Sequence, residues 1–337
     1  MGEVSGREEK FRQALLNEVK GSLFEYLVAQ ELAGAAGALG DFLTSIPDHY
    51  QQVLEQQERL LREADAGLAL LLPRWARQAA EAFRSSAVLP IEQVRLTGQL
   101  STTAQGQELG SCDVLLKGGA GDTRLSLKLN KARAAVNTKS GGVKSFFGQY
   151  FTHASAAREQ ERFSAAVERE HALVRRELFA LEDLPEEAPD WGPWRERGLT
   201  ELPGELRPEA RELLHAYYAR LARALDDSLA TLAAEDAGRF TQALALLAGL
   251  APQQVQLICF HEYPARDDLD VRVTSYRQGL AQLSQWQRLP ATDSASVEFA
   301  IGAWRLAIRV KPMNTFTTTA IKMNCSVRYE TRATRSR

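Results

Sequence analysis

Hydrophobic residues recur at steps of three to five near the start of the chain and predict a helix over residues 8–35. The stripe consists of Phe11, Leu15, Val19, Leu23, Leu27 and Leu32, which is close to the spacing of one helical face. A second helical region is predicted from about 47 to 83. We expect Pro73 to kink or break that region, because proline has no amide hydrogen for the helical ladder.

A period of two replaces the helical period in the next part of the chain. VRLTGQLST (94–102) has the pattern of a strand, and SCDVLLK (111–117) and TRLSLKLN (123–130) flank the glycine-rich segment GGAGD. Two alternating runs around such a segment predict a β-hairpin. The polar segment 137–151 that follows is expected to pass from loop into helix at its glycines.

The order of elements indicates an α+β protein. Residues 154–250 have a helical pattern that is interrupted by an acidic Pro/Trp-rich break at 181–194, and residues 254–329 are rich in strand patterns. The simplest architecture is a central mixed sheet flanked by helices, with 1–154 as a core, 155–250 as a helical insertion, and 251–337 completing the sheet or binding DNA. Two independent domains divided near 155 fit the pattern equally well.

Composition narrows the class of protein. With 45% hydrophobic and 25% charged residues the usage is that of a globular chain, and a net charge of −2 does not by itself indicate a partner. The sequence lacks an apolar run long enough for a membrane span and a signal-peptide pattern at its start. The cysteines at 112, 259 and 325 form no paired spacing, which favours a reducing compartment, so we expect a cytoplasmic protein without a membrane partner.

The predicted hairpin can carry an active site. If the leucines and valines of its two strands share the core face, the polar residues share the other face: Asp113, Lys117, Arg124, Ser126, Lys128 and Asn130. Pairing Lys117 with Arg124 would place Asp113 directly opposite Lys128, about 4.5–5.5 Å away at Cβ. Asp113 could then hold Mg²⁺ by oxygen ligation, and Lys128 could orient a water molecule or stabilise charge on a phosphate. A plain cross-strand ion pair is the alternative.

Two further features point toward phosphodiester chemistry. Glu25 lies at the border of the apolar stripe in KGSLFEYLVAQEL, so its carboxylate could reach the sheet if the helix packs across it. From 117 to 144 there are seven basic residues and one acidic residue, which is the charge pattern of a surface that binds a phosphate backbone. The residues expected to contact nucleic acid are Arg124, Asn130, Lys131, Asn137, Lys139, Ser140 and Lys144.

These residues together resemble the PD-(D/E)-x-K nuclease superfamily, especially its restriction endonucleases. Gly21, Phe24, Glu25, Val28 and Ala29 match its early helix, Asp113 matches its metal-binding aspartate, and Ser126-Leu127-Lys128 matches its (D/E)-x-K tripeptide. The sequence departs from the pattern at Cys112, where proline is usual, and at Ser126, where a second acid is usual. The resemblance implies that Glu25 replaces that acid and that the carbonyl of Leu127 is a further metal ligand, with Glu25, Asp113, Ser126 and Lys128 as the catalytic residues.

The leading hypothesis from the sequence is a DNA endonuclease that depends on Mg²⁺ or Mn²⁺ and belongs to restriction or anti-phage defence. Its partner would be DNA, with a homodimer or a regulatory protein partner also possible. One alternative is a nucleic-acid-binding protein of the same restriction-endonuclease-like fold without activity, which the loss of an acid at Ser126 would produce. The other is an interaction or scaffold protein whose helical region recruits a partner.

Overall fold

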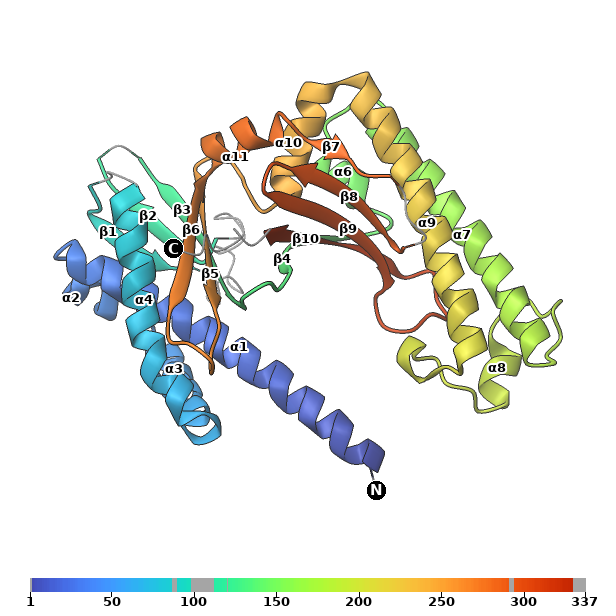
Figure 1. Ribbon diagram of the computed structural model, residues 1–337, viewed down its shortest axis with the longest axis horizontal. Coiled ribbons are helices and arrows are strands. Elements are labelled where there is room, and N and C mark those ends of the chain that lie inside the picture. Colours follow the sequence, from blue (N-terminus) through green and yellow to red (C-terminus); the bar gives the residue numbers. More distant parts are fainter. Residues whose placement is uncertain (1, 87–89, 98–111, 120, 291–293, 330–337) are drawn as a thin grey trace, which may run out of the picture. The chain divides into compact units, whose positions relative to one another are not determined.

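The computed structural model describes residues 2–86, 90–97, 112–119, 121–290 and 294–329. The chain forms two compact units (Figure 1). Unit 1 comprises residues 1–134 and 250–278, and unit 2 comprises residues 135–249 and 279–337. Each unit therefore joins an early segment to a late one, and each contains one sheet with its own helices.

A mixed five-stranded sheet forms the centre of unit 1. Its order is β1-β2-β3-β5-β6, built from β1 (Gln93–Leu96), β2 (Val114–Lys117), β3 (Thr123–Lys131), β5 (Gln254–His261) and β6 (Leu269–Ser275). Strands β3 and β5 are parallel, and the other neighbours are antiparallel. The predicted strand at 94–102 is described only as far as residue 97, and its remainder lies outside the described residues.

Among its described residues, unit 1 also has the helices α1 (Gly2–Ala35), α2 (Leu39–Thr44), α3 (Asp48–Ala64) and α4 (Ala66–Ser86). Helices α1 and α4 pack against the sheet, and α3 packs against both of these helices. The core between α1 and the sheet contains Phe24 and Val28, which meet Leu125, Leu127 and Leu257. The apolar stripe thus fixes which face of α1 lies on β3, and it also fixes where the neighbouring Glu25 can point.

The helical break lies at a different residue from the one expected. Pro73 is inside α4, whereas the boundary between α3 and α4 is at Asp65. The Asp65 carboxylate accepts hydrogen bonds from the Leu68 amide (3.0 Å) and from the Tyr263 hydroxyl (2.6 Å). A side chain that satisfies the free amides of a new helix favours a boundary there. Of the predicted kink or break at Pro73, the break is wrong, because α4 continues through that residue.

A second five-stranded sheet, which is antiparallel, forms unit 2. Its order is β4-β10-β9-β8-β7, built from β4 (Val136–Gly142), β7 (Gln287–Arg288), β8 (Ser296–Ile301), β9 (Trp304–Pro312) and β10 (Ile321–Tyr329). Along β9 and β10, buried and more exposed residues alternate strictly as far as Lys311 and Val327. One face of this sheet is therefore a core face and the other is polar.

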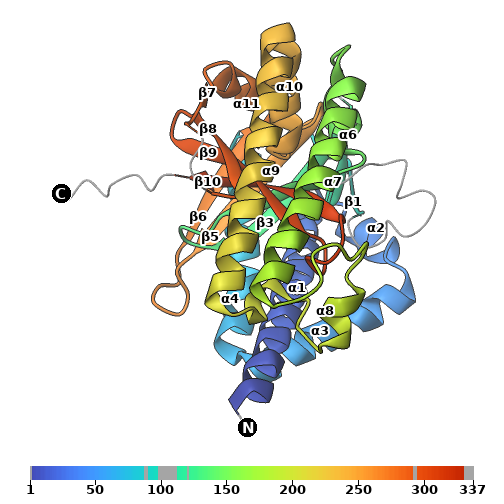
Figure 2. The same cartoon turned by 90° about the vertical axis from the view of Figure 1, so that its right-hand side faces the viewer.

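Helices cover the core face of the second sheet. The long helices α7 (Ala156–Leu181) and α9 (Pro208–Glu235) pack side by side (Figure 2), and α9 contacts β8 and β9. Helix α10 (Ala237–Leu247) contacts β4, and α6 (Phe146–Tyr150) packs on α7. The shorter elements are α8 (Gly192–Glu196), η1 (Pro203–Glu205) and α11 (Tyr276–Leu283).

The α+β class and the helix-flanked mixed sheet are confirmed. The polar segment 137–151 was expected to run from loop into helix, but residues 136–142 form strand β4 paired with β10. The strand-rich C-terminal part supplies β5 and β6 to one sheet and β7 to β10 to the other. Among the described residues there is no helix with the length and apolar content needed to cross a membrane.

Candidate active site

The hairpin expected to carry the site is formed by β2 and β3, but its register differs from the prediction. Arg124 pairs with Leu115 rather than with Lys117, so the predicted register is wrong by two residues. Because side chains alternate with a period of two, a two-residue shift leaves each residue on its predicted face. Asp113 and Lys128 consequently remain neighbours although they are not directly opposite.

Asp113 is held at the edge of β3 immediately before β2 begins. Its Oδ2 atom accepts a hydrogen bond from the backbone amide of Leu127 at 2.6 Å and lies 3.7 Å from Nζ of Lys128. Its backbone amide donates to Leu125 O, and its carbonyl accepts from Thr97 N. The Asp113 side chain is 16% exposed and that of Lys128 is 33% exposed. Two hydrogen bonds therefore fix the backbone of Asp113, and a third, from the Leu127 amide, orients its carboxylate, which remains partly exposed.

Glu25 of α1 reaches the same place. The pKa of Glu25 is raised to about 8, mainly by burial and next by the negative charge of Asp113, while Lys128 acts in the opposite direction. Such an electrostatic effect requires that the three side chains lie close together. The helix and the hairpin thus bring Glu25, Asp113 and Lys128 together, and Glu25 is protonated at neutral pH when no cation is present.

The two other residues of the predicted motif lie beside this group. Ser126 is buried on β3, two positions before Lys128. The Leu127 amide points to Asp113, and in an extended strand the carbonyl of a residue points to the same edge as its amide. The Leu127 carbonyl therefore faces the edge that carries Asp113, as a third oxygen ligand would require.

A hard divalent cation such as Mg²⁺ fits this group of oxygen atoms better than a metal ion that prefers nitrogen or sulfur ligands. Among the described residues, no set of three or more His, Cys, Asp and Glu side chains is placed to hold a metal ion. Mg²⁺, however, is commonly held by one or two carboxylates, with water and substrate phosphate completing its coordination. A carboxyl group whose pKa is raised by a neighbouring carboxylate is also one that a divalent cation would return to its charged form.

Three of the residues expected to contact nucleic acid belong to the same unit. Arg124 is close enough to Cys112 for its charge to lower the pKa of that thiol, although burial raises this pKa overall. Asn130 follows Lys128 on the same face of β3, and its Nδ2 atom is buried with no hydrogen-bond partner among the described residues. Lys131 is exposed at the end of β3. Strand β3 therefore presents polar donors on both sides of Lys128.

Sequence reasoning missed Lys20. This residue is buried on α1, and its Nζ lies 3.5 Å from Nε2 of His261. Burial and, to a smaller extent, the charges of Lys20 and Lys131 lower the pKa of His261 to about 4, so the imidazole is neutral at pH 7. Its ring stacks on Trp75 with a centroid distance of 4.9 Å. The signal was present in the sequence, since Lys20 precedes Phe24 by four residues and so shares the buried stripe.

The remaining predicted contact residues belong to unit 2. Asn137, Lys139 and Ser140 are in β4, and Lys144 is an exposed residue shortly before α6. Asn137 accepts a hydrogen bond from Asn324 (2.9 Å). Lys139 lies opposite the buried Cys325 in the register of β4 and β10. The basic stretch from 117 to 144 is thus divided between the two units after residue 134.

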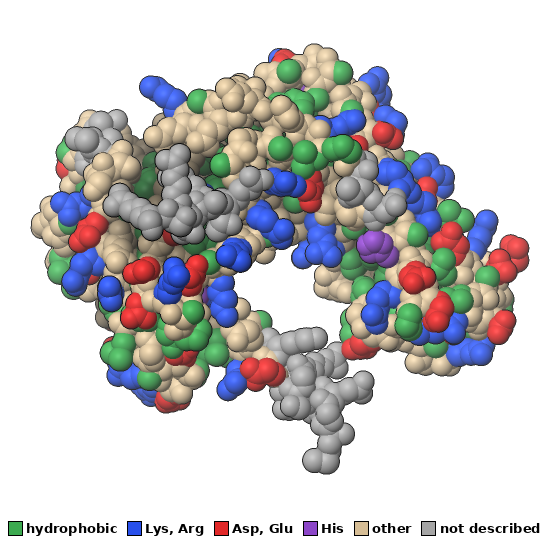
Figure 3. Space-filling view, in the orientation of Figure 1, with side chains coloured by type: hydrophobic (Ala, Val, Ile, Leu, Met, Phe, Trp, Pro, Cys, Tyr) green, Lys and Arg blue, Asp and Glu red, His purple; other side chains and the backbone are tan. Residues whose placement is uncertain are grey.

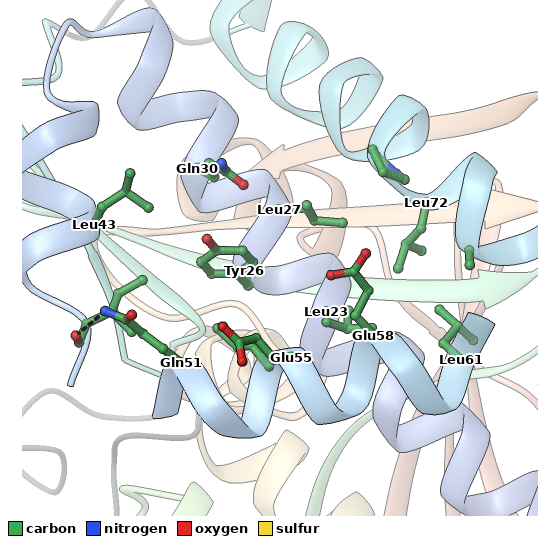
Figure 4. A pocket seen from close by; sticks show the side chains of 14 residues that line it. Leu23, Tyr26, Leu27, Gln30, Leu43, Gln51, Glu55, Glu58, Leu61 and Leu72 are labelled. Atoms are coloured by element: carbon green, nitrogen blue, oxygen red, sulfur yellow. Dashed lines mark hydrogen bonds between the residues drawn. The ribbon is translucent and has the colours of Figure 1, made fainter. Parts of the chain in front are cut away.

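An apolar cavity of about 480 Å³ lies among α1, α2, α3 and α4 (Figure 4). Leu23, Tyr26 and Leu72 contribute to its wall, and Glu55 and Glu58 of α3 point toward it. Neither Glu25 nor the hairpin residues line this cavity. It is therefore separate from the carboxylate group.

Comparisons of this chain with protein-family models, with curated proteins and with solved structures found no match. The geometry and charges of the site are consequently the basis for inferring its function.

Proposed function

We propose that the chain is a Mg²⁺-dependent endonuclease that hydrolyses phosphodiester bonds in DNA. The observation that carries this proposal is the grouping of Glu25 and Asp113 with Lys128, in which burial and then the charge of Asp113 raise the pKa of Glu25 to about 8 although Lys128 lowers it. The parts come from an early helix and a hairpin, as the restriction-endonuclease-like arrangement requires. A role in restriction or anti-phage defence rests on the motif resemblance alone.

Each side chain has a distinct task in this proposal. Glu25 and Asp113, with the Leu127 carbonyl, would hold Mg²⁺, which would supply Lewis-acid activation of the phosphate and of the attacking water. Lys128 would remain beside Asp113 and place its ammonium group toward the negative charge that develops on the scissile phosphate. Lys131, which is exposed at the end of β3, would contact a backbone phosphate.

The buried amine of Lys20 extends the positive charge of unit 1 along α1. Lys20 and Lys131 both lower the pKa of His261, so both ammonium groups lie near that ring. The neutral ring does not offset their charges.

A nucleic-acid-binding protein without activity is the second candidate. It is favoured by Ser126, because the nuclease motif usually has a second acid at this position of the hairpin. With serine there, Asp113 is the one acid that the motif itself supplies, and the other must come from Glu25 on the helix. DNA binding that persists in EDTA, with no cleavage in Mg²⁺ or Mn²⁺, would establish this alternative.

Cleavage of supercoiled plasmid in Mg²⁺ tests the nuclease proposal. We expect nicking or linearisation by the wild type, and a loss of at least about two orders of magnitude in rate for Asp113→Ala and Lys128→Ala. Lys117→Ala is the matched control, because Lys117 is in the same hairpin and forms no ion pair with any described residue. Equal cutting by all four proteins would refute the site, and absence of cutting by the wild type would refute the activity.

A further inference from the structure

The open face of the sheet in unit 2 is basic along two adjacent strands. Residues that alternate with the core positions of β9 are Arg305, Ala307, Arg309 and Lys311, and those of β10 are Lys322, Asn324, Ser326 and Arg328. Five of these eight side chains are Lys or Arg, and none is aromatic or a large apolar residue. We call these eight residues, with Asn137 of β4, the basic face.

The register places like charges directly opposite each other on this face. Lys311 pairs with Lys322 and Arg305 pairs with Arg328, while Arg309 pairs with Asn324. Opposed side chains on neighbouring strands are about 5 Å apart at Cβ, and like charges in that position destabilise a sheet. Burial lowers the pKa of Lys311, and the charges of Lys322 and Arg309 lower it further. The sequence therefore keeps cations where the fold alone would disfavour them.

Three of these cations have no acid paired with them within the described part of the chain. Arg309, Lys311 and Lys322 form no ion pair with a described residue, and the one acid at an outward position of β8 is Glu298, opposite Ala307. Asn324 and Asn137 add amide groups that are hydrogen-bonded to each other across β10 and β4. In Figure 3, Lys and Arg side chains gather over the region where Figure 1 draws β4, β9 and β10.

We propose that the basic face binds the phosphate backbone of a nucleic acid. Cations two residues apart on a strand are about 7 Å apart, and neighbouring strands are about 4.8 Å apart, so the face presents a closely spaced positive array. A nucleic acid offers a matching density of negative charge, and the amides and hydroxyl groups among the cations are donors that phosphate oxygens accept.

A protein partner fits this surface less well. The centres of protein interfaces are enriched in aromatic side chains and depleted in lysine, whereas nucleic-acid interfaces are polar and strongly positive. The basic face has the second composition. Because its contacts are made to phosphates, it would bind without preference for sequence, and it would hold the substrate of the endonuclease proposed above.

Binding of a fluorescent DNA duplex, measured in EDTA over a range of salt concentrations, tests this inference without requiring cleavage. Each phosphate contact that is lost lowers the slope of log K against log salt by about 0.9. We therefore expect Lys311→Gln with Lys322→Gln to lower the slope by about 2, and Arg309→Gln to lower it by about 1. Arg176→Gln on α7 is the control, because Arg176 is exposed in the helical layer of the same unit.

Loss of repulsion should leave the Lys311/Lys322 variant at least as stable as the wild type, so weaker binding would not reflect unfolding. An unchanged slope in the basic-face variants, or an equal effect of Arg176→Gln, would overturn the inference. Displacement of the duplex by polyglutamate at equal charge would also overturn it, because an acidic polypeptide would then serve as well. An RNA duplex in parallel identifies the preferred nucleic acid.

This inference deepens the proposed function, but the two can fail separately. A wild type that binds through the basic face and does not cleave would refute the nuclease activity alone. A wild type that cleaves, with basic-face variants that bind normally, would refute this surface alone.

Discussion

Glu25→Gln provides a quantitative test of the carboxylate group, because the pKa of Glu25 is raised from 4.5 to about 8 in the folded chain. Between these two values the unfolded chain carries a Glu25 carboxylate while the folded chain still binds the proton. The unfolded state thus binds fewer protons, and stability falls as pH rises above about 4.5, until the loss levels off above about 8. Glutamine carries no charge and removes this dependence.

The size of the effect follows from the two pKa values. One pKa unit corresponds to about 1.4 kcal/mol, so a shift of this size makes the wild type lose about 3 kcal/mol of unit 1 stability between pH 5 and pH 8. The glutamine variant should lack that loss. Glu18→Gln, an exposed position on the same helix, should behave as the wild type does.

Urea unfolding at both pH values can be followed separately in each unit by pulsed labelling of cysteine thiols. Cys259 is fully buried in unit 1 and Cys325 is fully buried in unit 2. We expect the pH-dependent difference between wild type and Glu25→Gln to appear at Cys259 and to be absent at Cys325. The same pH dependence in both proteins would show that the fold does not raise the pKa of Glu25.

Three further predictions concern the same unit. Asp113→Asn removes the neighbouring negative charge, so the pKa of Glu25, measured by carbon-13 NMR, should fall. An unchanged pKa would show that the two carboxyl groups do not interact. Mg²⁺ binding at pH 7 should release close to one proton, because Glu25 is mostly protonated beforehand. Calorimetry in two buffers of different ionisation enthalpy measures the number of protons released. Binding without proton release would contradict the prediction. Phe24→Ala should destabilise unit 1 by about 3–5 kcal/mol, because Phe24 is 1% exposed in the core; thiol labelling should show the loss at Cys259, and an equal loss at Cys325 would count against separate units.

Local patterns predicted much of unit 1. The stripe of α1 and the alternation in β2 and β3 assign Phe24, Leu125 and Leu127 to the core. This works because the positions that face the core recur with a fixed period along a helix or a strand. The same alternation assigned Asp113 and Lys128 to a common region. Their exact register could not be predicted, because the glycine-rich turn permits more than one pairing.

Long-range partners were less accessible from the sequence. Segment 136–142 contains two glycines and mostly polar residues, so only its pairing with β10 identifies it as a strand. The division of the basic stretch between two units has the same origin, since it depends on which distant strands pair. The repulsion between Lys311 and Lys322 likewise becomes visible only when β9 and β10 are in register.

The central claim is that Glu25 and Asp113 hold one divalent cation between them. A crystal of the chain soaked in Mn²⁺ tests this directly by anomalous scattering. A peak within coordination distance of carboxylate oxygens of both residues, lost in Asp113→Asn, is the predicted result. A peak that involves neither residue, or a Mn²⁺-saturated crystal with no peak between them, would contradict it.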